Sequence, residues 1–532
     1  MPPSATPRFK PHPERLGHGE HHFPLLAPHV KLQHHIMKTF PFCSPLILGA
    51  SIAVVSAESA PATPNFNEHV APIIFNHCAS CHRPGEAAPF SLMNYDDVKK
   101  RGRLIARVTE KRYMPPWHAE STDYRFADER KLTDAQIEII QAWVKNGSPE
   151  GGPAKRPALP EFTDGWQLGT PDLVVKMSEG YTVPAEGPDI YRNFVVPLNI
   201  KEDKWVQAVE FRPGARSVVH HSLFFLDVTG EARQLDADDP APGFKRMGLA
   251  LQRGGTLGGW AVGGTPNELP DGLAYKLPKG SDLILSTHFH PSGKEETEVS
   301  TLGIYFADKP PAHGFTAIQL PPVFGALAGI DIPAGEADYT KTDSFTLPVD
   351  VRAFAVSAHA HYLGKEIKMT ATLPGGETRE LLWIRDWDFA WQEQYKYSDW
   401  VELPAGTRID AKVVWDNSAD NVFNPHDPPQ RVRWGKESTD EMGSVTLQVM
   451  AADSGALRKL NTAINKHRRE AGEQAIRNRF ADRSKNGRGG SLMQRLLTRF
   501  DKDGDGKLSA EERRSAVASI PQEERRRLFR KR

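Results

Sequence analysis

Short alternating runs of apolar and polar residues dominate the middle of the chain. They are rich in Val, Thr, Phe and Ile, and Gly or Pro turns separate them at short intervals. Because the side chains of a strand point alternately to its two faces, this pattern predicts antiparallel strands stacked as jelly-roll-like β-sandwiches. The length fits two sandwiches, which we place at 164–312 and 313–455, with the break near Pro310–Ala312.

Helical patterns occupy the region before the predicted sandwiches. In 64–150, one short helix is indicated by four apolar residues: Val70, Ile73, Ile74 and Phe75. A longer helix opens with a capping box from Thr133 to Gln136 and carries an apolar stripe: Ile137, Ile140, Trp143 and Val144. A linker rich in Gly and Pro follows at 151–163. The sequence therefore predicts a small all-α domain ahead of the two all-β domains.

The N-terminal region has the features of an export signal. Residues 37–57 begin with Met37-Lys38 and continue as an apolar stretch from Pro45 to Val55, which is typical of a secretory signal peptide and too short for a permanent membrane span. The first 36 residues contain seven histidines and lack periodicity. We interpret them as a non-native extension from a start codon placed too early, with a disordered metal-binding tract as the alternative. We expect a periplasmic or secreted protein.

The tail at 456–532 also has a helical pattern, and its charge differs from that of the rest. It has 22 Lys and Arg against 10 Asp and Glu, although the 532 residues together are neutral, so the remainder is acidic. Such a basic tail predicts contact with anionic lipid at a membrane surface or with the acidic remainder of the chain. For an exported chain we expect no nucleic-acid partner.

The clearest short motif is Cys78-Ala79-Ser80-Cys81-His82. It predicts covalent attachment of one haem c through two thioethers, with His82 as the proximal iron ligand. A redox disulfide is the competing interpretation, and the terminal histidine argues against it. Met114 is the predicted second axial ligand because a thioether raises the haem potential, and His118 is its rival. The region 64–150 is thus interpreted as a cytochrome c domain.

Potential metal ligands are spread through both predicted sandwiches. Residues two apart share a strand face, so His359 and His361, at the end of a period-two run from Val349, should leave one face of one strand. His220 and His221 cannot both do so in a regular strand, which predicts a bulge or a strand end there. Imidazoles combined with a thioether suit copper. We predict two copper ions, one held by His220, His221 and His288, with His290 as the rival of His288, and one held by His359, His361 and Met442.

These segments, in this order, resemble the copper type II, ascorbate-dependent monooxygenases, the family of peptidylglycine alpha-hydroxylating monooxygenase and dopamine beta-monooxygenase. In that family a His-His pair and a later His hold one copper, and a His-x-His segment with a distant Met holds the other. The resemblance covers roughly 163–452. It implies that O2 reacts with a small-molecule substrate at the copper of His359, His361 and Met442, while the other copper delivers the second electron.

The resemblance also bears on the substrate and the electron donor. Peptide-amidating members have an Arg two residues before the His-x-His segment and a Tyr four residues after the methionine. This chain has Ser357 and Thr446 there, which argues against peptidylglycine. Family members draw electrons from ascorbate. Here the donor is an ascorbate-like reductant or a redox protein, and we expect the fused haem to pass electrons to copper because a covalently joined carrier has a high effective concentration.

A loop in the basic tail matches the ligand pattern of an EF-hand. Acidic and hydroxyl side chains recur at the required spacing within 501–512, and Gly506 stands at the sharp turn. We therefore predict a calcium ion bound by Asp501, Asp503, Asp505, Lys507, Ser509 and Glu512. A solvated acidic turn is the alternative.

The sequence as a whole predicts an exported copper-dependent monooxygenase that hydroxylates an activated C–H bond with O2. Two other classes stay open. One is a haem and copper electron-transfer or binding protein without oxygenase activity. The other is a surface interaction protein whose sandwiches bind carbohydrate or protein around structural metals. An open coordination position at the second copper separates that last class from an oxygenase.

Overall fold

The computed structural model describes residues 63–86, 88–162, 165–245, 254–262 and 264–485, of which 479–485 by backbone alone, and in the tail 499–502, 504, 509, 511, 512 and 515. All described residues lie within one compact unit of the chain. The predicted N-terminal extension and signal peptide lie outside the described residues. Among the helices described, none has both the length and the apolar character needed to cross a membrane.

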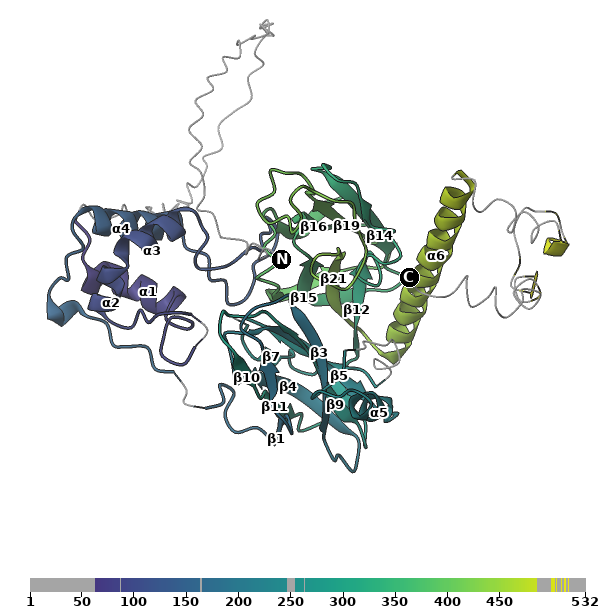
Figure 1. Cartoon of the computed structure of the whole chain (residues 1–532), viewed down its shortest axis with the longest axis horizontal. Helices are drawn as coiled ribbons and strands as arrows, with labels where there is room; N and C mark the ends of the chain where they lie inside the picture. Colours follow the sequence, from purple (N-terminus) through teal and green to yellow (C-terminus); the bar gives the residue numbers. More distant parts are fainter. Residues whose placement is uncertain are drawn as a thin grey trace, which may run out of the picture. The chain divides into compact units, whose positions relative to one another are not determined.

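Short helices form the first described region, drawn in purple and blue in Figure 1. They are η1 (Phe66–Val70), α1 (Ala71–His77), α2 (Tyr95–Lys100), α3 (Gly102–Glu110) and α4 (Asp134–Lys145). The predicted capping box is confirmed, because Thr133 and Gln136 each accept a hydrogen bond from the other's backbone N–H. Ile74, Ile140 and Trp143 are fully buried in a core of their own. The apolar stripe seen in the sequence closes this core.

One segment of the predicted helical domain belongs to the second sandwich. Glu120 pairs with Trp383 and Phe126 pairs with Tyr397 as isolated antiparallel bridges, and Phe126 is buried in the core of that sandwich. The prediction treated 64–150 as one domain. The structure differs because the segment between α3 and α4 has apolar side chains that the small helical core cannot cover, and the strand edge of the sandwich buries them. A single turn, η2 (Pro153–Lys155), lies in the linker.

The first sandwich contains two antiparallel four- and five-stranded sheets, in the orders β3-β9-β5-β6 and β1-β11-β4-β7 with β8 also on β4, and a small β10-β2 pair. The strands are β1 (Leu173–Lys176), β2 (Tyr181–Val183), β3 (Ile190–Pro197), β4 (Lys204–Arg212), β5 (Val219–Asp227), β6 (Thr256–Ala261), β7 (Asn267–Glu268), β8 (Tyr275–Leu277), β9 (Asp282–Phe289), β10 (Glu296–Glu298) and β11 (Thr301–Phe306), with α5 (Glu231–Ala237) after β5. The central strand β9 is buried at nearly every position, as a strand packed on both faces should be.

The second sandwich has the sheet orders β12-β21-β15-β18 and β14-β19-β16-β17, with a β13-β20 pair. Its strands are β12 (Phe315–Leu320), β13 (Asp331–Ile332), β14 (Tyr339–Thr346), β15 (Val351–Ala360), β16 (Gly364–Thr372), β17 (Thr378–Ile384), β18 (Gln394–Leu403), β19 (Arg408–Trp415), β20 (Val432–Arg433) and β21 (Gly443–Ala451). Several antiparallel β-sandwich sheets with flanking helices, the coarse form of the predicted architecture, are therefore present.

The strand that carries His359 contains a bulge, so the predicted unbroken period-two run is wrong in one detail. The pairing of β15 shifts between Ala353 and Ala355, so the period-two run from Val349 does not continue unbroken to the histidines. Before the bulge Ala353 is in the core of the second sandwich, whereas Phe354 and Ala355 pack into the core of the first. The extra residue lets one strand bury side chains in both cores.

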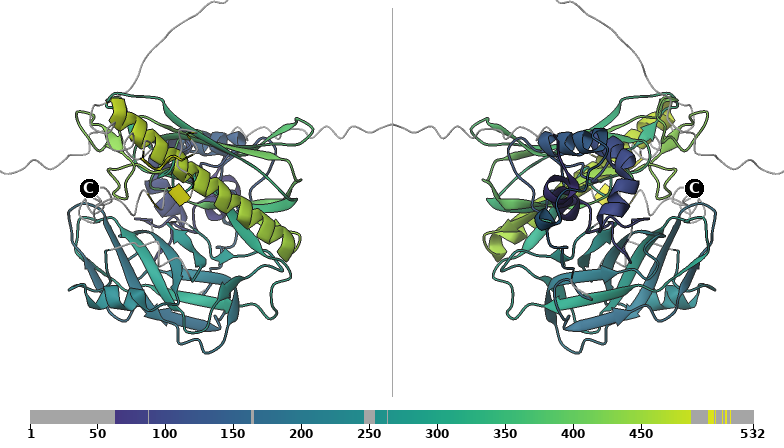
Figure 2. Two further views of the ribbon diagram at one scale, coloured as in Figure 1. Left: turned by 90° about the vertical axis from the view of Figure 1, so that its right-hand side faces the viewer. Right: turned by 90° about the vertical axis from the view of Figure 1, so that its left-hand side faces the viewer.

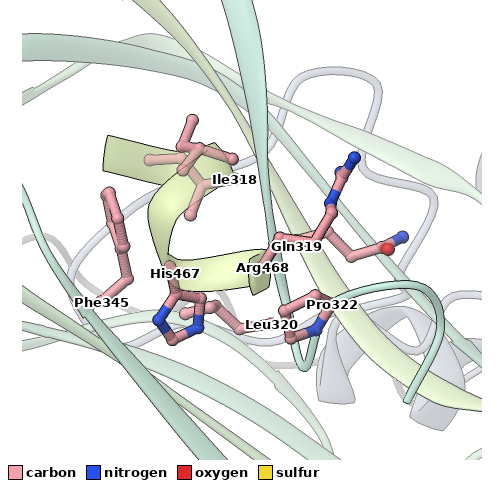
Figure 3. Close-up of a pocket in the computed structure, with 8 residues that line it drawn as sticks. Ile318, Gln319, Leu320, Pro322, Phe345, His467 and Arg468 are labelled. Atoms are coloured by element: carbon pink, nitrogen blue, oxygen red, sulfur yellow. The ribbon is translucent and has the colours of Figure 1, made fainter. Parts of the chain in front are cut away.

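A long helix, α6 (Ser454–Lys485), packs along the second sandwich against β12 and β21, as Figures 1 and 2 show. Leu460 of this helix is fully buried in the core of the second sandwich. Farther along, His467 lies beside Phe345 and forms a 2.9 Å contact with Asp343 of β14. Figure 3 shows this junction, where the helix covers Ile318 and Leu320. The first half of α6 is thus anchored to the second sandwich.

Candidate metal centre

The first histidine set lies on two neighbouring strands of the first sandwich. β5 carries His220 and His221, β9 carries His288, and the register places His221 opposite His288. The pairing shifts by one residue between Val219 and His221, so the predicted bulge is confirmed. His288 Nδ1 lies 3.2 Å from both His220 Nδ1 and His221 Nε2. Within the described part of the chain, this trio is the one group of three or more His, Cys, Asp or Glu that could hold a metal ion.

The spacing and ionisation of the three rings fit a metal. Ligand atoms about 2.0–2.1 Å from a tetrahedral metal are about 3.3–3.4 Å apart, close to the spacing observed here. Burial lowers the pKa of His220 to about 3 and holds the pKa of His221 well below its usual value, and His288 lowers both further. The rings of His220 and His221 are therefore neutral at pH 7, and neutral imidazole is the form that binds metal.

Asp189, just before β3, supports His288 from behind. Its two carboxylate oxygens lie 3.0 Å from His288 Nε2 and 2.8 Å from His290 Nδ1. Burial raises the pKa of Asp189, but the two histidines beside it outweigh this effect and hold the pKa far below its usual range. A carboxylate 3.0 Å from His288 Nε2 favours a proton on that nitrogen and leaves Nδ1 for a metal. His290 is 62% exposed and stays outside the trio.

The second histidine set lies at the end of β15. His359 is the penultimate residue of the strand and His361 follows it, with ring centroids 5.2 Å apart. The Nδ1 atom of His359 lies 2.6 Å from Gln392 Oε1, and that of His361 lies 3.0 Å from the Asp440 carbonyl. Both acceptors fix the proton on Nδ1, which leaves Nε2 of each ring for a metal. Burial lowers the pKa of His359 to about 4 and that of His361 to about 3, so both rings are neutral.

The strand register brings Met442 to the second set. Ala360 pairs with Gly443 on β21, so Met442 stands next along the ladder beside His361. Buried Glu441 holds these two backbones together, because its Oε2 accepts hydrogen bonds from the N–H groups of His361 and Met442 at 3.0 and 3.1 Å. Burial raises the pKa of Glu441 to about 8, against the effect of these donors.

Phe389, in the loop between β17 and β18, lies between the two histidine sets. Its ring centroid is 5.3 Å from that of His220 and 5.7 Å from that of His361. The two sets also interact electrostatically. The pKa of His221 is lowered mainly by burial, then by His288 and His220, and further by His359 and His361 of the second set. Histidines from two sandwiches therefore surround one aromatic side chain.

A polar chain also connects the two sets. Tyr191 stacks on His288 with a centroid separation of 4.2 Å, and its hydroxyl lies 2.9 Å from that of Ser438. Ser438 in turn donates to Asp189 Oδ2 at 2.7 Å. Ser438 stands four residues before Met442, so the loop that carries the predicted thioether ligand is bonded to the carboxylate behind His288. Four residues at this centre were not predicted, because they recur at no fixed spacing from the histidines: Asp189, Tyr191, Phe389 and Gln392.

The Cys-x-x-Cys-His motif lies at the end of α1. Cys78 and Cys81 are unbridged, and burial raises the pKa of Cys78 to about 12. His82 Nδ1 lies 3.1 Å from the Phe90 carbonyl, which places the ring proton on Nδ1. Nε2 is then unprotonated and can serve as an iron ligand. Burial lowers the pKa of His82, with a smaller opposing effect from Phe90. Two thiols and one neutral imidazole of this kind fit a covalently held haem.

The two candidates for the second axial ligand differ in their surroundings. Met114 follows α3, is partly buried, and donates from its backbone N–H to Val108. His118 is engaged with the second sandwich, since Asp388 and the backbone of Asp386 raise its pKa against the larger lowering by burial. His118 thus contacts the second sandwich, and Met114 as the second axial ligand stays a prediction.

Only part of the predicted calcium loop is described. Glu512 accepts hydrogen bonds from the backbone N–H groups of Lys502 and Ser509, each at 2.7 Å, and Asp501 Oδ1 accepts from Gly504 at 2.8 Å. The closing carboxylate therefore folds back across the described positions of the loop. The predicted ligands Asp503, Asp505 and Lys507 lie outside the described residues.

Comparison with known proteins adds one distant relative. No protein-family pattern matches the chain. The human DBH-like monooxygenase protein 1 is 22% identical over 315 residues, which are 53% of this chain and 50% of that protein. The chain thus spans about half the length of this relative.

Solved structures give only weak likenesses. The infectious bursal disease virus VP2 subviral particle aligns with 55% of this chain and 74% of its own at 9% identity and a TM-score of 0.17. The major capsid protein P2 of bacteriophage PM2 aligns with 49% of this chain and 97% of its own at 9% identity and a TM-score of 0.20. These scores are too low to bear on function. The chain is distantly similar to a DBH-like monooxygenase and carries a histidine trio, with His288 buried and the other two half-buried, that is suited to a metal such as copper.

Proposed function

We propose that this protein is a copper-dependent monooxygenase that hydroxylates an activated C–H bond with O2. The observation that carries the proposal is the meeting of two sets of imidazoles, one from each sandwich and each at least half-buried, around a single aromatic ring. The distant similarity to a DBH-like monooxygenase supports it. Copper bound at the two sets would supply the one-electron chemistry that O2 requires.

The roles of the protein's own groups follow from their hydrogen bonds. His220, His221 and His288 would hold the first copper, and Asp189 keeps the last of them in the required tautomer. His359 and His361 would hold the second copper through Nε2, together with the thioether of Met442. A set of three ligands leaves room for a reactant, whereas a structural site fills all its positions.

We further propose that a haem c attached at Cys78 and Cys81 supplies the electrons. Support comes from the free thiols, from the neutral His82, and from the contacts that join this region to both sandwiches. Arg216 of the first sandwich bonds to Glu86, and Arg130 contacts Glu393, the residue after Gln392, which supports His359. A carrier held in this way would have a high effective concentration at the copper sites.

Export, calcium and membrane contact belong to the same proposal. A haem attached through thioethers is consistent with the predicted signal peptide and with a periplasmic or secreted protein. The fold of Glu512 across its loop supports a calcium-binding tail, and the basic residues of that tail would suit an anionic lipid surface.

Metal content and copper EPR of the full-length chain test the core of the proposal. We expect two coppers and one haem, with His220→Ala abolishing the first copper signal and Met442→Ala perturbing the second. His313→Ala, an exposed histidine outside both sets, is the matched control and should leave both signals unchanged. One copper or none would refute the two-site proposal. Both coppers without coupled O2 consumption on any C–H substrate would identify an electron carrier instead.

A further inference from the structure

Phe389 fills the space between the two histidine sets. Besides its contacts with His220 and His361, its ring centroid lies 5.9 Å from that of His288, and the side chain is only 8% exposed. A tight turn holds it there, because the N–H of Trp391 and that of Ala390 both bond to Asp388. A phenyl ring thus occupies the position between the sets where a reacting C–H group would have to lie.

The loop that carries Phe389 is bonded to both sets. The carbonyl of Ala390 accepts a hydrogen bond from His220, and Trp387 Nε1 donates to the His361 carbonyl at 3.2 Å. Gln392 bonds to His359 through its oxygen and to the Phe389 carbonyl through its nitrogen, at 2.6 and 3.0 Å. The position of the ring is therefore tied to the histidines.

Two more aromatic rings continue the apolar surface around the second set. Tyr362 lies 4.5 Å from Phe389 between centroids, and Phe324 lies 5.2 Å from His359 with its ring edge-on. Phe324 and the preceding Val323 have φ angles of 52° and 55°, which side chains rarely adopt and a β-branched one least of all. Strain of this kind persists where surrounding bonds over-determine it, often at a functional site.

Hydrogen bonds hold the strained segment in place. Phe324 donates from its N–H to Gln319 Oε1 at 3.1 Å, and its carbonyl accepts from Trp434 Nε1 and from the N–H of Gly443 at 3.0 and 3.1 Å. Gly443 directly follows Met442, so the segment that places Phe324 against His359 is bonded to the strand that carries the predicted thioether.

The cationic side chains near these rings in sequence are paired with carboxylates. Lys365 bonds to Asp338, Arg385 to Glu120 and Arg352 to Glu402, each at 2.7 or 2.8 Å. Ser357 stands where the resemblance would place an arginine for a substrate carboxylate. A negatively charged substrate would therefore meet three aromatic rings without a free counter-charge from these residues, at a high desolvation cost.

We propose that this centre accepts a substrate with an apolar, ring-sized group and no negative charge, and that Phe389 sets this specificity. The substrate displaces the Phe389 ring and takes its place between the histidine sets, beside Tyr362 and Phe324. The assignment of this molecule as a substrate rests on the proposed function, whereas its binding is a property of the folded chain.

Calorimetry on the metal-free full-length chain tests the binding, with benzyl alcohol as the neutral probe and benzoate as its charged counterpart. Phe389→Ala should bind benzyl alcohol about tenfold or more tightly than the wild type, because the probe no longer has to displace a ring, and should gain nothing for benzoate. Phe389→Leu keeps more of the buried volume and should show a smaller gain in affinity for benzyl alcohol. It replaces the alanine variant in this test if that variant does not fold.

Phe345→Ala is the matched control, since Phe345 is a buried ring of the same sandwich that packs against His467 of α6. In copper-loaded protein, benzyl alcohol should alter the EPR signal of Phe389→Ala and leave that of Phe345→Ala unchanged. Equal affinity of wild type and Phe389→Ala for benzyl alcohol, or equal gains for benzoate, would overturn the inference. A chain that binds the probe but no copper would instead refute the proposed function.

Discussion

Asp189 bonds to two histidines, and only one of them belongs to the first set. One carboxylate oxygen lies 3.0 Å from Nε2 of buried His288, and the other is hydrogen-bonded to exposed His290 at 2.8 Å. Strand geometry alone could not choose between these histidines, because both lie on the same face near the end of β9. The choice depends on which ring faces β5 and which faces solvent.

Replacing Asp189 with Asn should weaken copper binding at the first set. The neutral amide is a poorer acceptor for His288 Nε2–H, and loss of such supporting partners typically costs about 10–100-fold in metal affinity. Competition with a copper chelator measures the change. His290→Asn is the control and should leave the affinity unchanged. If His290→Asn weakens binding as much as Asp189→Asn, the assignment of His288 as the ligand is wrong.

Glu441→Gln should destabilise the second sandwich. Four N–H groups point at the oxygens of this buried carboxyl group, from His361, Leu363, Met442 and the indole of Trp415. An amide presents an NH2 group to at least one of these donors, which leaves a buried N–H unsatisfied at a cost of about 1–3 kcal/mol. Urea denaturation measures the loss, and Glu437→Gln, at an exposed position four residues earlier, should cost little. Equal stability of the two variants would contradict this account.

At the scale of elements, bulges in two strands decide how the histidines are presented. The shift in β5 lets adjacent His220 and His221 face the same partner, and the shift in β15 separates side chains for two cores. The first could be predicted, because two adjacent ligands cannot share one face of a regular strand. The second could not, because small apolar residues suit either face equally well.

The packing of α6 on the second sandwich should depend on pH. The hydrogen bond to Asp343 raises the pKa of His467 above its usual 6.5, against a smaller lowering by burial. A raised pKa in the folded state means that the stabilisation is complete below pH 6.5 and is lost as the pH rises through the folded pKa. The histidines with lowered pKa values make an opposite contribution that is the same in wild type and in Asp343→Asn. In thermal unfolding from pH 5.5 to 8.5, the advantage of wild type over Asp343→Asn should therefore shrink as the pH rises. A difference between the two that does not change with pH would exclude the His467–Asp343 pair as a pH-dependent contact.

At the scale of the whole molecule, the segment between α3 and α4 connects the helical region to the second sandwich. Phe126 stacks on Tyr397 at 5.4 Å and lies 5.7 Å from Tyr395, so its ring completes the core of the sandwich. The motif at Cys78 and the site at His359 are thereby parts of one packed structure, which the proposed electron supply would need.

Phe126→Ala should weaken the sandwich and leave the helical core intact. Truncation of a buried Phe costs about 3–5 kcal/mol through lost contacts and the cavity that remains. Hydrogen exchange read by mass spectrometry should show faster exchange in β17 and β18. Ile140→Ala is the counterpart in the helical core and should speed exchange in α4 instead. If Phe126→Ala affects only α3 and α4, the segment does not belong to the sandwich.

The sequence by itself determined the types of side chain available for chemistry and the periodicity of the elements that carry them. Cys78, Cys81 and His82, the capping box at Thr133 and the alternating strands are local patterns, because their physical basis lies within a few residues of chain. The tertiary structure decided the rest. Asp189, Phe389 and Gln392 reach the histidines from distant segments and recur at no fixed spacing, and the same holds for Phe126 in the sandwich core. Such contacts depend on which distant segments the fold brings together, and the periodicity within one segment does not specify that.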